Sequence, residues 1–236
     1  METIILAGGL GTRLRSVVND IPKCMAPIDG KPLLWYWLKY LENNQIDNVV
    51  LALGYLSDTI ISWISEIKSQ FSCKISYTIE TQPLGTGGAI RLALKETSSD
   101  EVLIVNGDSF FAISLQDYFQ KYYRNPTTIS LALKKMQNFS RYGNVKLDSN
   151  GTIISFEEKR YCKEGLINTG IYIVKPKELN LDNYQQKFSF ENEILQNRND
   201  ISGFVFEDYF IDIGIPEDYF KAQKDLPKIF QAYLHK

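Results

Sequence analysis

Histidine is almost missing from this chain of 236 residues, which contains only His235, the penultimate residue. A chain end of this kind is expected to be mobile unless something ties it down. Catalysis by an imidazole in the core is therefore not expected, which excludes Ser-His-Asp and Cys-His nucleophilic arrangements. Zinc sites built on pairs of histidines are excluded for the same reason.

Cysteine is scarce too. Cys24, Cys73 and Cys162 lie far apart and form no C-x-x-C pair, so neither a disulfide framework nor a zinc cluster is predicted, and free thiols fit a reducing cytosol. The N-terminus lacks the basic segment and long apolar core of a signal peptide. The longest apolar stretch, near Leu33–Leu38, is far shorter than the roughly 20 residues that a membrane span needs. We predict a cytoplasmic protein without a membrane partner.

An excess of charge of one sign is missing as well. The 26 Lys and Arg residues almost balance the 28 Asp and Glu residues, and the formal net charge is −2. This balance gives no electrostatic reason to expect nucleic acid or an anionic membrane as a partner. With 44% hydrophobic and 23% charged residues, the composition is that of an ordinary globular protein. The length corresponds to about 1.6 average domains.

Apolar runs alternate with helix-like segments through the first half of the chain. The predicted strands are Thr3–Leu6, 49–53, Ile75–Ile79 and Val102–Val105, and the predicted helices are Lys31–Asn44, Ser57–Phe71 and Ala89–Glu96. Strands that alternate with helices indicate βαβ units and a parallel sheet.

The second half has a different pattern. Asn150-Gly151 lies between the strand-like runs Val145–Leu147 and Ile153–Phe156, which predicts a hairpin. Ile171–Val174 and Phe204–Ile211 are further predicted strands, and a helix is expected to begin at Pro216. We predict an α/β fold: a Rossmann-like three-layer α/β/α domain over residues 1–236. Its mainly parallel mixed sheet gains a few antiparallel strands in the second half.

A glycine-rich loop follows the first predicted strand. Gly8, Gly9 and Gly11 allow consecutive backbone N–H groups to face an anion at the start of a helix, and Arg13 adds a forked donor suited to phosphate. The loop lacks the Gly-Lys-Ser/Thr ending of a P-loop, and Leu14 stands where a dinucleotide fingerprint needs Gly or Ala. A tight strand-to-helix turn is the alternative to a phosphate site.

Two aspartates are candidate metal ligands. Asp108 follows Val102–Val105 at the carboxyl end of a predicted parallel strand, where open α/β sheets bind ligands, and Asp212 lies in another strand-like context. Two carboxylates together with phosphates and waters suit octahedral Mg²⁺. Each aspartate taken alone is more typical of a cap or a turn than of a metal ligand. Glu191 and Glu193 are weaker candidates, since they are expected to decorate a solvated helix start.

Eight sequence blocks resemble, in order and spacing, the signature of the sugar-phosphate nucleotidyltransferases, and they span nearly the whole chain. They are Gly8-Gly9-Leu10-Gly11-Thr12-Arg13-Leu14, Pro22-Lys23-Cys24-Met25-Ala26-Pro27, Gly30-Lys31-Pro32, Pro83–Ala89, Asn106-Gly107-Asp108, Glu158-Lys159, Asn168-Thr169-Gly170 and Phe210–Gly214. Arg141-Tyr142-Gly143 is similar to the subfamily that transfers guanylyl groups to D-glycero-D-manno-heptose 1-phosphate. Two positions depart from the pattern: Cys24 replaces a proline, and Gln82 replaces an acidic residue.

The resemblance implies a role for each matching residue. The catalytic residues would be Arg13 on the departing pyrophosphate, Lys23 and Lys159 on phosphates, and Asp108 and Asp212 as Mg²⁺ ligands. The nucleotide would be bound by Leu6, Gly8, Gly9, Gly11, Thr12, Gln82, Gly87 and Gly88, and the sugar by Gly143, Glu158, Asn168 and Thr169. From composition alone, Lys23 and Lys159 would be ordinary surface lysines. Residues 1–110 would form the nucleotide-binding half and residues 111–236 the sugar-phosphate half.

The implied reaction joins an NTP, with GTP preferred, to a sugar 1-phosphate, with the manno-heptose preferred, and releases pyrophosphate. Its product is an NDP-sugar for bacterial surface polysaccharide such as capsule or lipopolysaccharide. The phosphate nucleophile is already anionic at pH 7, so this chemistry needs no imidazole base, consistent with the single histidine. The alternatives are the same reaction with another NTP or hexose 1-phosphate, a glycosyltransferase, and a nucleotide-sensing relative without turnover. The oligomeric state is left open, with a homo-oligomer among the options.

One observation weighs against a glycosyltransferase, and another weighs against a nucleotide sensor. Glycosyltransferases of this shape usually carry Asp-x-Asp near the donor metal, and Asn106-Gly107-Asp108 is a poor match to that pattern. A nucleotide sensor would not be expected to retain all five catalytic residues together. Release of pyrophosphate from an NTP separates the nucleotidyltransferase from both.

Overall fold

The computed structural model describes residues 1–9, 14, 17–18, 21–157 and 160–234. Strands and helices alternate through the first half. Its elements are β1 (Glu2–Leu6), the 3-10 turn η2 (Lys23–Met25), β2 (Pro27–Ile28), β3 (Lys31–Pro32), α1 (Leu33–Asn43), β4 (Asn48–Leu53), α2 (Ser57–Ile67), the 3-10 turn η3 (Lys68–Gln70), β5 (Lys74–Ile79), α3 (Gly85–Leu94), β6 (Val102–Asn106), β7 (Ser109–Phe111) and α4 (Leu115–Arg124). The four strands expected here are present.

Strands dominate the second half, as the hairpin signal indicates. Its elements are β8 (Ile129–Phe139), β9 (Asn144–Leu147), β10 (Ile153–Glu157), β11 (Cys162–Val174), α5 (Pro176–Leu179), the 3-10 turn η4 (Leu181–Asn183), the π-helix η5 (Phe190–Leu195), β12 (Ile201–Phe206), β13 (Phe210–Asp212) and α6 (Pro216–Leu234). The hairpin β9–β10 and the helix start at Pro216 are confirmed.

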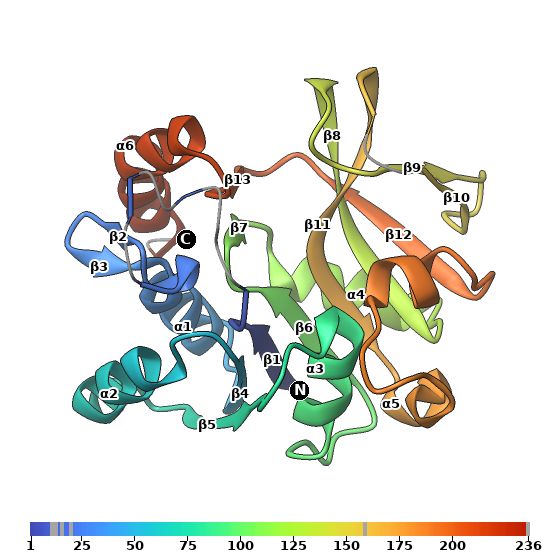
Figure 1. Ribbon diagram of the computed structural model, residues 1–236. Coiled ribbons are helices and arrows are strands. Elements are labelled where there is room, and N and C mark those ends of the chain that lie inside the picture. The colour runs from blue at the N-terminus through green and yellow to red at the C-terminus, as the bar shows by residue number, and fades with distance from the viewer. Residues whose placement is uncertain (10–13, 15–16, 19–20, 158–159, 235–236) are drawn as a thin grey trace.

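One nine-stranded sheet contains strands from both halves (Figure 1). Its first part has the order β6-β1-β4-β5 with all strands parallel, so that Leu6 is paired with Ala52 on one side and Asn106 on the other. Strand β11 then runs antiparallel to β6 and also pairs with β8 and β9. From β1 the chain first adds β4 and β5 on one side and then adds β6 on the other side. Such a reversal of strand order leaves a ligand crevice at the carboxyl ends of the parallel strands.

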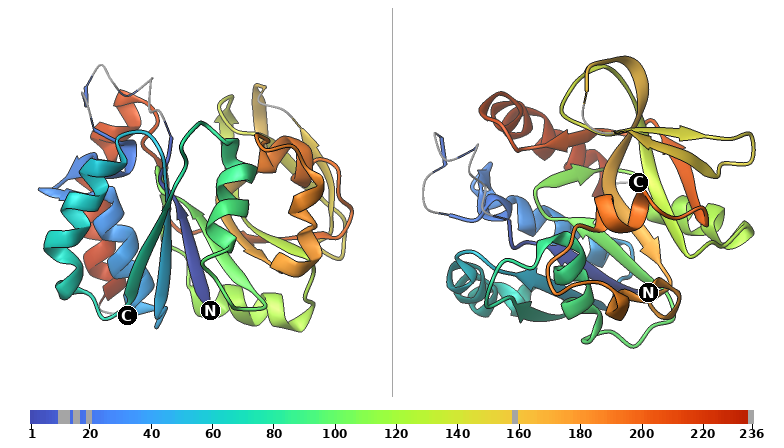
Figure 2. Two further views of the ribbon diagram at one scale, coloured as in Figure 1. Left: turned by 60° about the horizontal axis from the view of Figure 1, so that its bottom comes forward. Right: turned by 45° about the vertical axis from the view of Figure 1, so that its right-hand side comes forward.

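Helices cover both faces of this sheet, as Figure 2 shows in its left view. Two neighbouring residues of β1 show why both faces need helices. Ile5 packs into one core cluster, to which α1, α2, α4 and α6 contribute. Ile4 packs into a second cluster, to which α3, α5 and η5 contribute. Both isoleucines are fully buried. Successive side chains of a strand point to opposite faces, so a run of apolar residues requires helices on both sides. The predicted three-layer α/β/α fold is therefore confirmed.

Several predicted boundaries differ from the observed ones. The helix expected over Lys31–Asn44 begins at Leu33, because Lys31 and Pro32 pair with β2 and Pro32 is extended (ψ 153°). The helix expected over Ser57–Phe71 ends at Ile67 and continues as η3. The helix expected from Ala89 begins four residues earlier, at Gly85.

The single strand expected over Phe204–Ile211 is in fact two strands. β12 ends at Phe206 and pairs with β8 in the large sheet, whereas β13 pairs with the short strand β7. β13 places Asp212 opposite Ser109. This break matters for the site, because it brings Asp212 next to Asp108, the residue that precedes β7.

Helix α3 packs very closely against the segment before η5. The N–H of Gly87 donates to the carbonyl of Phe188 (3.0 Å), and a Cβ at Gly87 would lie 2.1 Å from the Phe188 ring. A Cβ at Gly88 would lie 2.7 Å from the carbonyl oxygen of Gln186. These two glycines therefore serve a close approach between two elements, where any side chain would clash.

Gly87→Ala is expected to destabilise the protein by about 1–3 kcal/mol, because the added methyl group overpacks the contact with Phe188. The direction of the change tests the contact, since Gly→Ala inside a helix without this contact raises the free energy of unfolding by roughly 1 kcal/mol. Urea denaturation measures the change. The same substitution in a Phe188→Leu background is the control, and an equal loss in both backgrounds would contradict the proposed clash.

Cys24, Cys73 and Cys162 are free. Within the described ranges, no helix combines the length and the apolar character that crossing a membrane requires.

Candidate active site

Two adjoining cavities open at the carboxyl ends of the parallel strands. The first, of about 570 Å³, is lined by residues that follow or end β1, β4, β5 and β6. The second, of about 580 Å³, lies between β6, β11, η5 and the β7–β13 pair. Lys23, Thr86, Asn106 and Asp108 line both cavities. Two ligands bound side by side would therefore meet at these four residues.

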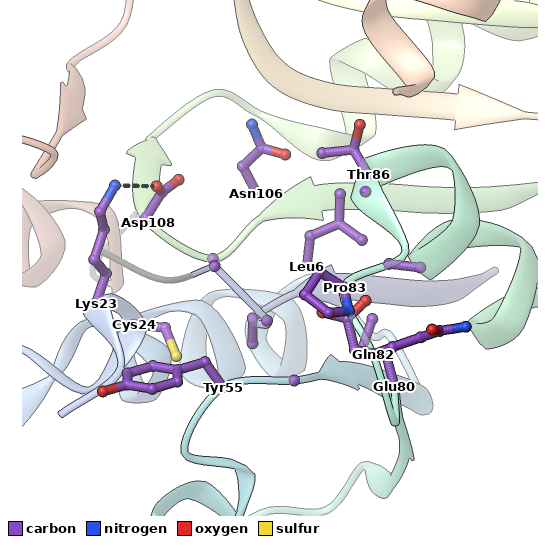
Figure 3. Close-up of a pocket in the computed structure, with 18 of the residues that line it drawn as sticks. Leu6, Lys23, Cys24, Tyr55, Glu80, Gln82, Pro83, Thr86, Asn106 and Asp108 are labelled. Atoms are coloured by element: carbon purple, nitrogen blue, oxygen red, sulfur yellow. Dashed lines mark hydrogen bonds and ion pairs between the residues drawn. The ribbon is translucent and has the colours of Figure 1, made fainter. Parts of the chain in front are cut away.

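Most residues predicted for the nucleotide that the structure describes line the first cavity. Leu6, Gly8, Gly9 and Gln82 are among them, together with Lys23 and Asp108. Figure 3 shows Lys23 and Asp108 on one side of the opening and Thr86 on the other, with Asn106 between them. Gly87 and Gly88, also predicted for the nucleotide, lie in the packed contact of α3 with Phe188 and Gln186.

Glu80 is a residue of the first cavity that the sequence analysis did not single out. It directly follows β5, and its Oε2 accepts a hydrogen bond from the N–H of Leu84 (3.0 Å). A Cβ at Gly54 would lie 2.5 Å from Oε1 of Glu80, so the glycine makes room for the carboxylate beside Gly8. The signal in the sequence was an acidic residue at the carboxyl end of a predicted parallel strand, the same signal that identified Asp108.

Cys24, which departs from the family pattern, lies in the wall of the first cavity. Its thiol is buried, and burial together with the nearby Asp108 carboxylate raises its pKa to about 12. The thiol therefore stays protonated at neutral pH and acts as a small apolar part of the wall.

Lys23 is held at the junction of the two cavities by the stiff loop that carries it. The loop forms the single turn η2 between Pro22 and Ala26, and the N–H of Ala26 donates to the carbonyl of Lys23 (2.9 Å). Nζ of Lys23 lies 2.9 Å from Oδ2 of Asp108. The Lys23 side chain is 15% exposed, so its charge faces the cavities and not bulk solvent.

The two predicted metal ligands come together on the paired strands β7 and β13. The N–H of Ile213 donates to the carbonyl of Asp108 (3.1 Å), and the N–H of Gly214 donates to Oδ1 of Asp212 (2.7 Å). Burial raises the pKa of Asp212, and the like charge of Asp108 raises it further. Two carboxylates that repel each other in a cavity wall form a donor set that a divalent cation would stabilise.

No third His, Cys, Asp or Glu joins these two aspartates in the described part of the chain. A cation held here would therefore complete its coordination with oxygens from phosphates and waters. Mg²⁺ is bound in this way in many phosphate-transferring sites, by one or two carboxylates and the substrate. The residues present thus fit the predicted ion.

The second cavity contains the residues that were predicted for the sugar and that the structure describes. Gly143, Asn168 and Thr169 line it with Asp212. Nδ2 of Asn168 donates to the Tyr172 hydroxyl (2.8 Å), and its Oδ1 accepts from the N–H of Gly170 (3.0 Å), so the amide is fixed. The strand β11 therefore presents an oriented amide to this cavity.

Arg141, to which the sequence analysis assigned no role, lines the second cavity. Its guanidinium pairs with Asp218 in the first turn of α6 and donates to the hydroxyl of Tyr142 (3.0 Å). Arg141 lines the same wall as Asp212 and Lys23. Lys23 and Arg141 are thus two cations near the Asp212 carboxylate in the lining of this cavity, and such cations suit phosphate.

Glu191 does not have the solvated position expected for it. Its Oε2 accepts hydrogen bonds from the hydroxyls of Thr86 (2.6 Å) and Ser189 (2.9 Å), and the residue lines the second cavity. Glu193 keeps a helix-start role, because its carboxylate accepts from the N–H of Ser189 (2.8 Å). Neither glutamate joins the aspartate pair as a metal ligand among the described residues.

Five predicted site residues lie outside the described residues: Gly11, Thr12, Arg13, Glu158 and Lys159. Their roles remain predictions.

Comparison with known proteins identifies the class that this fold and these cavities define. The profile of the nucleotidyl transferase family matches residues 2–229, and the chain belongs to this family. It is 45% identical over 229 residues to a D-glycero-alpha-D-manno-heptose 1-phosphate guanylyltransferase of Aneurinibacillus thermoaerophilus, covering 96% of this chain and 98% of the relative. It is 47% identical over 223 residues to a protein of the same name from Campylobacter jejuni, covering 93% and 97% of the two chains.

A solved structure agrees with these sequence relatives. HddC from Yersinia pseudotuberculosis, crystallised in complex with GMP-PN, superposes with a TM-score of 0.86 at 37% sequence identity. The superposition covers 95% of this chain and 99% of that protein. The predicted resemblance to sugar-phosphate nucleotidyltransferases is confirmed.

Proposed function

We propose that this chain joins GTP to D-glycero-D-manno-heptose 1-phosphate and releases pyrophosphate. The observation that carries the proposal is the pair of cavities that meet at Lys23 and Asp108, since the reaction requires two phosphorylated substrates to be in contact at one point. The identities of 45% and 47% to the two heptose 1-phosphate guanylyltransferases support the choice of sugar and base.

The first cavity supports a guanine base through Glu80. Guanine presents two adjacent donors, its N1–H and its exocyclic amine, and an ionised carboxylate offers two acceptor oxygens with the same spacing. The carboxylate occupies the space that a side chain at Gly54 would take, in the wall of the first cavity beside Gly8. Gln82, the residue predicted for this contact, also lines the cavity. We therefore assign recognition of the base to Glu80.

The chemical step is attack by an oxygen of the sugar 1-phosphate on the α-phosphorus of GTP. The nucleophile is anionic at neutral pH, so the chain has to position two anions and stabilise charge, and it does not have to remove a proton. Lys23 is placed to contact both substrates because it lines both cavities. Arg141 would bind the sugar phosphate, and we assign Arg13 to the departing pyrophosphate and Lys159 to the sugar phosphate.

Asp108 and Asp212 are the residues that would hold Mg²⁺. When bound, the ion would neutralise phosphate oxygens and the charge that develops on the transferring phosphoryl group. Asp108 lies beside Lys23, and Asp212 is oriented by the N–H of Gly214. The two carboxylates thus stay fixed with respect to the lysine that contacts the substrates.

The two halves of the chain divide the substrates between them in this proposal. Residues 1–110 line the first cavity and would hold the nucleotide, and residues 111–236 supply most of the second cavity and would hold the sugar. We place the reaction in the cytoplasm, where nucleotide sugars for capsule or lipopolysaccharide are made. The free thiols support a reducing compartment.

A matrix of four NTPs and several sugar 1-phosphates, with Mg²⁺ and pyrophosphate release as the readout, tests the proposal. We expect GTP with the manno-heptose 1-phosphate to give the highest kcat/KM, and EDTA to abolish product. A preference for UTP or dTTP would contradict the assignment of Glu80. Nucleotide binding without any product would favour the sensor alternative.

A further inference from the structure

The wall of the second cavity includes a full turn of π-helix, which is a rare conformation that often occurs at functional sites. In η5, the N–H of Gln196 donates to the carbonyl of Glu191 (3.1 Å), five residues earlier. Phe190, Ile194 and Leu195 face the core and are almost fully buried. The apolar side of this turn is thus fixed by packing.

The wide turn brings three polar residues to the cavity. Glu191, Asn192 and Gln196 all line it. In an α-helix, residues 191 and 196 would point about 140° apart, because each residue turns the helix by roughly 100°. The i to i+5 turn therefore allows Glu191 and Gln196 to face the same ligand while the apolar residues remain in the core.

η5 adjoins the second cavity on the side of Thr86, opposite Lys23 and Asp108 (Figure 3). Glu191 is hydrogen-bonded to Thr86 (2.6 Å), and Figure 3 shows Thr86 across the opening from Lys23 and Asp108. A sugar 1-phosphate whose phosphate lies at the lysine therefore extends its ring and its exocyclic carbons toward η5.

Two of the three side chains are free to bind. Asn192 and Gln196 are exposed, and their amide groups make no hydrogen bond to another described residue. Each amide offers both donors and an acceptor, the pattern that pairs with hydroxyl groups. Glu191, by contrast, is already held by Thr86 and Ser189.

We propose that Asn192 and Gln196 form a specificity subsite for the exocyclic hydroxyl groups of the sugar. The inference rests on the proposed function. A manno-heptose differs from mannose by one additional hydroxyl-bearing carbon beyond the ring, so a subsite at this end distinguishes the two sugars. Glu191 acts as a positioning residue that fixes the turn against Thr86.

The test is the double variant Asn192→Ala/Gln196→Ala, assayed with the manno-heptose 1-phosphate and with mannose 1-phosphate, each as substrate and as competitive inhibitor. We expect kcat/KM for the heptose to fall about tenfold or more, because two uncharged hydrogen bonds are lost. Mannose 1-phosphate keeps one exocyclic hydroxyl, so its kcat/KM or inhibition constant is expected to change by a smaller factor than that of the heptose, and the KM for GTP is expected to change less than about threefold. Gln185→Ala is the matched control, because Gln185 is an exposed amide between η4 and η5 and does not line this cavity.

The outcomes separate the subsite from the function on which it rests. An equal loss for both sugars, or no loss for either, would overturn the subsite while wild-type activity with the heptose sustains the proposed reaction. A wild-type enzyme that uses neither sugar would overturn the reaction and the subsite with it. Thermal melting shows whether the variant is folded, and both side chains are exposed, so the melting temperature is expected to be unchanged.

Discussion

Asp108→Asn is expected to reduce turnover by at least about a thousandfold while the fold remains intact. Asparagine keeps the size and one oxygen of the side chain but removes the charge that would hold a divalent cation together with Asp212. It also removes the ion pair with Lys23, whose Nζ lies 2.9 Å from Oδ2. Pyrophosphate release under saturating GTP, sugar 1-phosphate and Mg²⁺ measures the effect.

The fold should tolerate this substitution because the Asp108 side chain is 40% exposed and β7 is held through backbone bonds to β13. Circular dichroism and thermal melting check this. Asp117→Asn is the matched control, since Asp117 pairs with Lys121 on the surface of α4 and lies outside both cavities. Near-normal activity of Asp108→Asn at saturating Mg²⁺ would refute the metal assignment.

Glu80→Gln is expected to lower kcat/KM for GTP by about a hundredfold, since hydrogen bonds from guanine to an ionised acceptor are replaced by weaker ones and one acceptor becomes a donor. The amide oxygen of glutamine can still accept the N–H of Leu84, so the loop should keep its conformation. Because glutamine presents a donor and an acceptor, relative activity with UTP and dTTP is expected to rise. Competition between NTPs in one assay measures the preference.

Gln82→Glu separates the two candidates for base recognition. This variant restores the acidic residue of the family pattern at the position predicted from the sequence, next to Pro83 in the same cavity wall. If Glu80 recognises the base, Gln82→Glu leaves the NTP preference unchanged. A marked change in preference for Gln82→Glu, with little effect of Glu80→Gln, would reverse the assignment.

The parts of the site that follow from local pattern could be predicted. Asp108 and the glycines at residues 8 and 9 stand directly after apolar strands, and parallel strands bring such positions to one edge of the sheet. Glu80 carries the same signal, but the departure from the family pattern lies two residues later, at Gln82. The role of Gly87 was not visible, because the residue it approaches, Phe188, lies about a hundred residues further along the chain.

The sequence by itself determined the layered α/β fold, because strand and helix periodicity are local features. It determined the reaction class through the resemblance of its eight motif blocks to the sugar-phosphate nucleotidyltransferases. Only the tertiary structure decided which residues meet. The break between β12 and β13, which brings Asp212 to Asp108, depends on pairing with β7, and the π-turn that brings Glu191 and Gln196 together depends on packing against the core. The first is a long-range choice of backbone partner, and the second is a local backbone hydrogen bond held in place by long-range packing.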